Sequence, residues 1–332
     1  MILHPPILAL LAGALLGGFL LLFASRHAIR ILRRWDLDSG SELQLELERR
    51  TCLVSTVVAY ACAFQAASLF LFVYTADDLA ALFVGAMCAA GTLHANPYGY
   101  PALGLKAAGA VLSGVWLVVN HADNRGRDYP LIREKYVFLL ALVPLFLAET
   151  AAMAAYFGGL KAEVITSCCG SLFGGSSTGV GSELASLPVF PMQAAFYASV
   201  AALLAAGAVY LRRGAGGRFA AAAGMTAFAV SLASIVSFIS PFVYELPTHR
   251  CPFCILQREY HYIGYPMYGL LFAGAVSSAG LGWLGGRRIP SLASVLPPLT
   301  RRLAVTAMVC FGAFAALVTW AMLSTSFRLE GY

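Results

Sequence analysis

Charged residues are scarce in this chain of 332 residues. Asp, Glu, Lys and Arg make up only 11% of it, whereas 60% of the residues are hydrophobic. Soluble domains carry about 25% charged residues, and the mean hydropathy here is +0.77. These values exclude an ordinary soluble domain and predict an all-α, polytopic bundle of membrane helices. The net charge of +6 is modest and its arginines fall mainly in loops between apolar runs, so we expect no nucleic-acid partner.

Several familiar site patterns are missing as well. Eight cysteines are too few for a scaffold stapled by disulfides. The sequence has no nucleotide-binding glycine pattern, no Ser-His-acid arrangement, no helical His-x-x-x-His pair and no convincing internal repeat. The positions of the cysteines therefore matter more than their number.

Nine apolar runs are long enough to cross a bilayer core, which takes about 20 residues. They lie at 7–24, 52–74, 79–95, 103–120, 137–157, 192–211, 219–240, 260–284 and 303–323. The run at 79–95 is interrupted by Gly91 and followed by Asn96, Pro97 and Gly99, so it could be re-entrant. We predict eight or nine spans in contact with membrane lipid.

Basic residues set the expected orientation. The first run has no basic residue before it and four after it, so we expect a retained span with its N-terminus outside. The short basic loops at 211–218 and 286–302 are expected in the cytoplasm, which leaves 158–191 and 241–259 outside. In a bacterium this predicts an inner-membrane protein with those two loops in the periplasm.

The N-terminal half conflicts with this rule. Loops 25–51 and 121–136 both look cytoplasmic, yet three candidate runs separate them, and an odd number of crossings cannot return to the same side. Either 79–95 is re-entrant or one loop departs from the charge rule.

A Cys-Pro-Phe-Cys motif, Cys251 to Cys254, lies directly before the run at 260–284. The two-residue spacing lets both sulfurs meet within one helical turn, as a disulfide requires. A helix beginning near Cys254 would favour its thiolate, and Arg258 is expected on the same helix face, near that thiolate or a reduced quinone oxygen. An inert structural disulfide and a zinc site are the alternatives, although no second thiol pair of matching spacing supports zinc.

A second pair, Cys168-Cys169, lies in the loop at 158–191 and precedes a Gly/Ser-rich stretch. Adjacent α-carbons are about 3.8 Å apart, below the usual 4.4–6.8 Å of disulfides, so a vicinal bridge would be strained and easily reduced. Alternatively, one of these thiols attacks Cys251 and the other resolves the product. Simple packing is the non-redox alternative.

The segment Cys-Pro-Phe-Cys-Ile-Leu-Gln-Arg at 251–258 resembles the thiol motif and trailing arginine of DsbB, the bacterial quinone-linked disulfide-forming protein. The order of elements over 135–285 resembles instead the vitamin K epoxide reductase (VKOR) family, whose four-helix core is related to DsbB by circular permutation. In that order a loop with shuttle cysteines precedes two spans and the Cys-x-x-Cys opens the fourth. Family shuttle cysteines are normally several residues apart, whereas Cys168 and Cys169 are adjacent.

The resemblance implies a thiol:quinone oxidoreductase that passes electrons between extracytoplasmic protein thiols and ubiquinone or menaquinone. Cys254 would be the quinone-facing thiol, with Arg258 near the quinone. Cys251 would exchange with Cys168 and Cys169, which would meet a thioredoxin-like partner. The redox core would cover 135–285, after membrane helices of unknown role at 1–134 and before a basic loop and final span at 286–332.

Other polar residues near the core are weaker candidates. His249 and His261 could pass protons, and His261 with Tyr262 could line the quinone site; alternatively they belong to an interfacial aromatic belt. Glu149, inside the run at 137–157, could serve a quinone pocket or proton path, or pair two helices. Cysteines in other apolar runs are expected to be packing residues: Cys52, Cys62, Cys88 and Cys310.

Two other functions compete with the redox hypothesis. The first is a soft-metal transporter or metal chaperone that uses the two cysteine pairs as thiolate ligands. The histidines and methionines do not gather around the motifs, which counts against it. The second is a structural role with additional membrane subunits, which would suit the N-terminal half.

Overall fold

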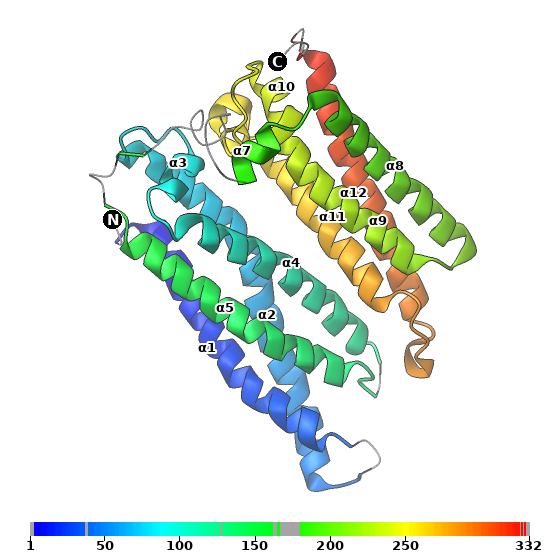
Figure 1. Ribbon diagram of the computed structural model, residues 1–332. Coiled ribbons are helices and arrows are strands. Elements are labelled where there is room, and N and C mark those ends of the chain that lie inside the picture. The colour runs from blue at the N-terminus through cyan, green and yellow to red at the C-terminus, as the bar shows by residue number, and fades with distance from the viewer. Residues whose placement is uncertain are drawn as a thin grey trace. The chain divides into compact units, whose positions relative to one another are not determined.

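The computed structural model describes residues 3–36, 39–126, 128–161, 165–166, 180–325, 327 and 329, and all regular structure in these ranges is helical (Figure 1). Eight helical stretches are long and apolar enough to cross a membrane. This confirms the predicted all-α polytopic bundle and fixes the number of spans among the described residues at eight.

The eight spans are built from the following elements. They are α1 (Pro5–Arg34), α2 (Glu42–Asp78) continued by the 3-10 turn η1 (Leu79–Leu82), α4 (Gly99–Asp123), α5 (Ile132–Gly158), α8 (Val189–Arg213), α9 (Gly217–Ser234) continued by η2 (Ile235–Ile239) and α10 (Ser240–Tyr244), α11 (Gly264–Leu284) and α12 (Leu296–Ser324). Short pieces outside the spans are α3 (Ala89–His94), α7 (Val180–Ala185), and the 3-10 turns η3 (Cys254–Leu256), η4 (Arg258–Tyr260) and η5 (Pro290–Leu292).

The apolar run at 79–95, the third along the chain, does not form a membrane span of its own. It begins as η1, turns at Gly85 with a φ of +88°, and ends in the six-residue helix α3. Only two spans then separate loops 25–51 and 121–136, so an even number of crossings places both loops on one side. The re-entrant alternative resolves the conflict in the charge rule.

The chain forms two compact units, each built from segments distant in sequence. The first contains Met1–Thr75, Asn96–Lys161 and Arg287–Leu299, and the second contains Ala76–Ala95, Ala162–Gly286 and Thr300–Tyr332. In the first unit α5 packs against α1 and α4; in the second, α9 packs against α8 and α11. The predicted core at 135–285 would instead combine α5 with α8, α9 and α11, and that grouping stays a prediction.

Aromatic packing attaches the last helix to the second unit. The Phe196 ring of α8 lies 5.8 Å from the Phe314 ring of α12 and 5.9 Å from the Phe238 ring of η2. Nearer the other end of α8, the Tyr210 hydroxyl donates to Thr300 Oγ1 of α12 over 2.8 Å. The second unit therefore contains four spans.

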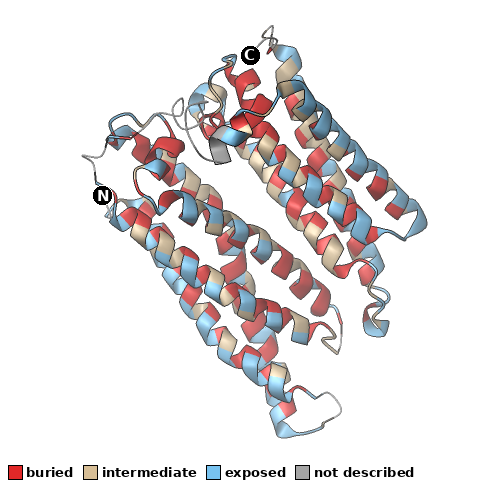
Figure 2. Cartoon of the chain, in the orientation of Figure 1, coloured by how far each residue is buried: buried red, intermediate tan, exposed pale blue. Residues whose placement is uncertain are grey.

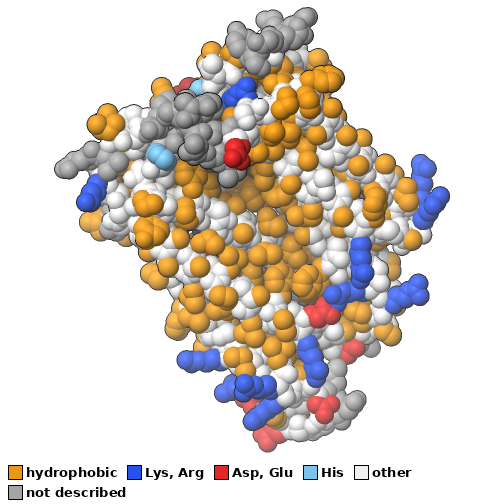
Figure 3. Space-filling view, in the orientation of Figure 1, with side chains coloured by type: hydrophobic (Ala, Val, Ile, Leu, Met, Phe, Trp, Pro, Cys, Tyr) orange, Lys and Arg blue, Asp and Glu red, His pale blue; other side chains and the backbone are white. Residues whose placement is uncertain are grey.

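Each long helix buries one side and exposes another (Figure 2). Large exposed apolar side chains include Leu15, Phe19, Phe219 and Leu323. On the face in Figure 3, hydrophobic side chains cover the middle of the helices and Lys and Arg lie towards helix ends. Apolar surface of this kind suits a lipid environment, in agreement with a multi-pass membrane protein.

A π-helical turn interrupts the span that leads to the thiol motif. η2 has five residues, Ile235–Ile239, and Pro241 follows in the first turn of α10. Proline has no N–H to donate and its ring crowds the preceding turn, so the helix widens there rather than continuing regularly. Tyr244 at the end of α10 then faces the motif, as the next section describes.

Candidate thiol site

The Cys-Pro-Phe-Cys motif lies between α10 and α11, in short turns rather than in a long helix. Cys254 begins the 3-10 turn η3, Gln257 is extended with a ψ of 162°, and Arg258 begins η4. The continuous helix α11 starts only at Gly264, whose Cβ position would lie 2.9 Å from the carbonyl oxygen of Ile255. Only glycine lets α11 begin this close to η3.

The expectation that Arg258 shares a helix face with Cys254 is therefore wrong. The backbone breaks at Gln257 and again at His261 and Tyr262, which both have positive φ. Arg258 and His261 are exposed, as is Tyr262, whose ring lies 6.2 Å from that of Tyr265. Their predicted contact with a quinone stays a prediction.

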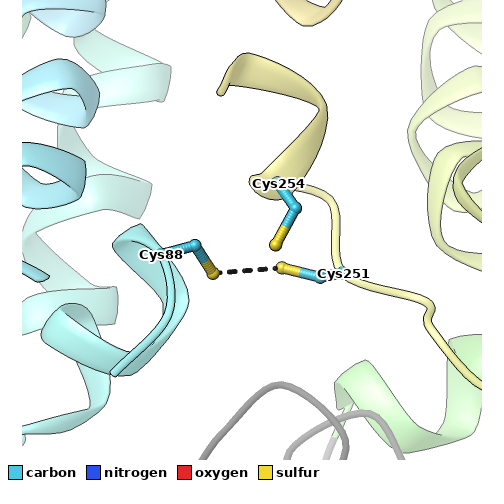
Figure 4. Close-up of side chains that lie close together, drawn as sticks. All are labelled: Cys88, Cys251 and Cys254. Atoms are coloured by element: carbon cyan, nitrogen blue, oxygen red, sulfur yellow. Dashed lines mark hydrogen bonds between the residues drawn. The ribbon is translucent and has the colours of Figure 1, made fainter. Parts of the chain in front are cut away.

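Three cysteine sulfurs meet at this motif. Cys88 Sγ lies 3.5 Å from Cys251 Sγ, and the sulfurs of Cys88, Cys251 and Cys254 all lie within 4.8 Å of one another (Figure 4). All three side chains are buried, with 0%, 0% and 3% of their surface exposed. The motif therefore has a third thiol, contributed by a segment more than 160 residues earlier.

The expectation that Cys88 lies within an apolar helix is wrong. Cys88 precedes α3 in extended backbone, with φ −161° and ψ −179°. The sequence contains one indication that Cys88 can reach the motif. If 79–95 does not cross the membrane, four spans separate it from 241–263, so both segments lie on one side. Cys52, Cys62 and Cys310 do lie within long helices, as expected.

A hydrogen-bond network holds the backbone on both sides of Cys88. Asp77 Oδ1 accepts the Ala89 N–H over 3.0 Å and Gln257 Nε2 over 3.1 Å. Gln257 Nε2 also donates to the Met87 carbonyl over 2.8 Å. Because Gln257 lies three residues after Cys254, the same side chain connects the Cys88 segment to the motif.

Two tyrosines hold the backbone of the motif from the flanking helices. Tyr244 of α10 donates to the Cys251 carbonyl over 2.5 Å, and Tyr268 of α11 donates to the Pro252 carbonyl over 2.8 Å. The Phe253 N–H points at Cys251 Sγ, 3.4 Å away. These contacts hold the backbone at Cys251 and Pro252, and the Phe253 N–H also contacts the Cys251 sulfur.

A histidine accompanies the second motif cysteine. His249 Nε2 lies 3.4 Å from Cys254 Sγ, and its ring packs edge-on against Tyr244 with centroids 4.5 Å apart. Burial lowers the pKa of His249, which outweighs the opposing effect of Cys88. The neutral imidazole therefore predominates at neutral pH and can accept a thiol proton. This is the position that the proton-passing hypothesis needs.

The second cysteine pair, Cys168 and Cys169, lies outside the described residues. Thr166, two residues before Cys168, donates its N–H to the Val84 carbonyl over 3.0 Å. At the neighbouring Gly85, a Cβ would lie 2.4 Å from the Thr166 carbonyl oxygen, and the φ of +88° also favours glycine. The described end of this loop is thus bonded four residues before Cys88.

Glu149 belongs to the first unit, in α5. Its Oε1 lies 2.6 Å from Lys106 Nζ of α4, and its Oε2 accepts a hydrogen bond from Gln65 of α2. All three side chains are buried. This geometry is what the helix-pairing alternative for Glu149 describes, and its predicted role at a quinone stays a prediction. Neither partner was identified from the sequence.

The arrangement suits two kinds of chemistry. Sulfurs 3.5 Å apart need to close by about 1.5 Å to form a disulfide of about 2.05 Å. Alternatively, the three cysteine sulfurs could hold a metal ion, and His249 Nε2 lies beside one of them, Cys254 Sγ. Both arrangements include Cys88 together with the motif cysteines.

Comparison of the chain with protein-family models, with curated proteins and with solved structures finds no significant match.

Proposed function

We propose that this protein is an integral-membrane thiol oxidoreductase that passes electrons between extracytoplasmic protein thiols and a membrane quinone. The observation that carries the proposal is the buried group of three sulfurs, within 4.8 Å of one another, beside the turns that connect two candidate membrane spans. A buried thiol pair with a neutral histidine beside it is suited to thiol–disulfide exchange.

The reaction has two halves. A partner dithiol reduces the Cys251–Cys254 disulfide, becoming a disulfide itself and leaving two thiols on this chain. A quinone, when bound, accepts two electrons and two protons as that disulfide forms again. Cys251 exchanges with the partner or with Cys168 and Cys169, and His249 takes the proton of the Cys254 thiol.

The surroundings of the motif are compatible with a quinone. Phe253, Ile255 and Leu256 are buried beside the sulfurs, and the Tyr244 and Tyr260 rings lie 4.5 Å apart. Apolar and aromatic side chains of this kind suit a quinone ring and its isoprenoid tail. Ubiquinone and menaquinone both fit this description.

The proposed location is the inner membrane of a bacterium, with the sulfurs facing the periplasm. Support comes from the basic loops, which the charge rule assigns to the cytoplasm, and from the even number of spans between the Cys88 segment and the motif. The proposed partner is a thioredoxin-like periplasmic protein, because such a protein supplies the dithiol that the first half of the reaction requires.

The test is quinone reduction by the full chain in lipid nanodiscs, with dithiothreitol as electron donor and a short-chain ubiquinone as acceptor. Cys254→Ser should lower the rate to that of empty nanodiscs, while Cys310→Ser, a change to a buried cysteine within α12, should leave it unchanged. A normal rate in Cys254→Ser would refute the proposal.

A soft-metal site is the second candidate function. The 3.5 Å between two sulfurs is close to the roughly 3.8 Å edge of a tetrahedral site with 2.3 Å zinc–sulfur bonds. A metal transporter or chaperone would use Cys88, Cys251 and Cys254 with His249. Stoichiometric metal in the purified protein, together with no thiol oxidation by quinone, would favour this function over the redox one.

A further inference from the structure

We infer that Cys88 is a third redox thiol, which exchanges with Cys251 and moves the disulfide from the Cys251–Cys254 pair to a Cys88–Cys251 pair. This inference rests on the proposed thiol chemistry and extends it to a residue outside the Cys-Pro-Phe-Cys motif.

The distance between sulfurs supports direct exchange. Cys88 Sγ and Cys251 Sγ are 3.5 Å apart, near van der Waals contact. Rotation about the two side chains and a small backbone shift can supply the remaining approach of about 1.5 Å. Both side chains are buried, so they can meet without an external thiol between them.

The placement of Cys88 depends on directed polar contacts. A cysteine that only fills space needs apolar neighbours, whereas the residues on both sides of Cys88 are hydrogen-bonded to a common network. Asp77 accepts from Ala89, and Gln257 donates to both Asp77 and Met87. The network therefore holds the segment around Cys88 in a defined position against the motif.

The exchange step balances without an added oxidant. The Cys88 thiolate attacks Cys251 Sγ, and the Cys88–Cys251 bond forms as the Cys251–Cys254 bond breaks. Cys254 leaves as a thiolate, 3.4 Å from His249 Nε2, and takes up the proton that Cys88 lost. One disulfide and one thiol are present before and after the step.

As a consequence, the single disulfide of the oxidised site can lie at either of two positions. With the disulfide on Cys88 and Cys251, the Cys254 thiol is released beside His249 while the protein stays oxidised. The Cys88 side is also where the described end of the Cys168 loop is bonded, through Thr166 and Val84.

The test maps the disulfide isomers of the full chain in lipid nanodiscs. The background carries Cys52→Ser, Cys168→Ser and Cys169→Ser, so that neither the exposed Cys52 nor the second cysteine pair exchanges with the three clustered thiols. The protein is oxidised by two electrons in a glutathione buffer, quenched in acid, alkylated after unfolding and mapped by mass spectrometry. We expect both isomers, seen as alkylation of Cys88 in one fraction and of Cys254 in the other.

Two variants separate exchange from simple proximity. Cys254→Ser should keep a Cys88–Cys251 disulfide, and Cys88→Ser should keep only Cys251–Cys254. The matched control, Cys310→Ser, should reproduce the isomer distribution of the background. Cys88 alkylated in every oxidised sample, with Cys251 of the Cys254→Ser variant bound to glutathione instead of bridged, would overturn the inference.

Quinone reduction measured on the same preparations distinguishes the two proposals. Two isomers without quinone reduction would support the exchange step and contradict the quinone half of the proposed function. Quinone reduction with a single Cys251–Cys254 isomer would support the proposed function and contradict the role of Cys88.

Discussion

Gln257 offers the sharpest test of how the third thiol is positioned. Its side-chain amide donates to Asp77 and to the Met87 carbonyl, and both bonds bring the Cys88 segment to the motif. Methionine has nearly the same length and cannot donate either bond, so Gln257→Met removes the connection with little change in volume. Each hydrogen bond contributes about 1 kcal/mol net, so the pair contributes about 2 kcal/mol.

Part of that loss should appear in the equilibrium between Cys88 and Cys251. Without these hydrogen bonds the Cys88 segment is less ordered, and forming the disulfide must order it again at a cost in free energy. A cost of about 1.4 kcal/mol lowers the equilibrium constant for disulfide formation tenfold. We therefore expect Gln257→Met, in a Cys254→Ser background, to lower the equilibrium constant for the Cys88–Cys251 disulfide about tenfold.

The assay is a titration in glutathione buffers of increasing oxidising strength, with acid quenching and mass-spectrometric quantification of the bridged peptide. Gln193→Met, in α8, is the matched control and should not shift the titration. An effect of Gln257→Met below about twofold, in a variant of unchanged thermal stability, would refute the view that these hydrogen bonds position Cys88.

Three further predictions concern single groups. Burial lowers the pKa of His249 below its ordinary 6.5, so the neutral base persists at pH 7 and is lost only below pH 6.5. Thiol–disulfide exchange measured by rapid alkylation should therefore slow at such acid pH values, and His249→Ala should remove this pH dependence. Lys106→Met strands a buried Glu149 and should cost about 3–5 kcal/mol in chemical unfolding, most of which Glu149→Gln should restore; no recovery would contradict the pairing. Gly85→Ala, at φ +88°, should raise hydrogen exchange in its turn at a cost of about 1–3 kcal/mol. Gly104→Ala, in open space within α4, should not destabilise, and equal effects would refute the argument.

The spans were predictable because a membrane helix leaves a local signal. Eight of the nine apolar runs correspond to observed spans, and the broken run at 79–95 was recognised as a possible re-entrant segment. The start of α11, the helix that follows the thiol motif, was predicted too early. The apolar run begins at 260, but α11 begins at Gly264 because His261 and Tyr262 take positive φ. Backbone breaks of this kind are set by packing that the local sequence does not display.

The site was only partly predictable for a related reason. The spacing of Cys251 and Cys254 identifies them as a thiol motif, because it is a local sequence pattern. Cys88 and Gln257 are connected to each other's segments by contacts across more than 160 residues, and apart from the break in the run at 79–95 nothing near Cys88 in sequence indicates them. The partner of Glu149, Lys106, is likewise on a different helix.

The make-up of the second compact unit has a practical consequence for dissecting the molecule. Residues 76–95 belong to the unit that holds the motif, although 66 residues of the first unit, 96–161, follow them in the chain. A fragment beginning at residue 135, as the family-like core suggests, would retain Cys251 and Cys254 and lose both Cys88 and Asp77. Such a fragment could still insert and carry a disulfide, but its motif would hold two sulfurs instead of three, with Gln257 deprived of both its acceptors.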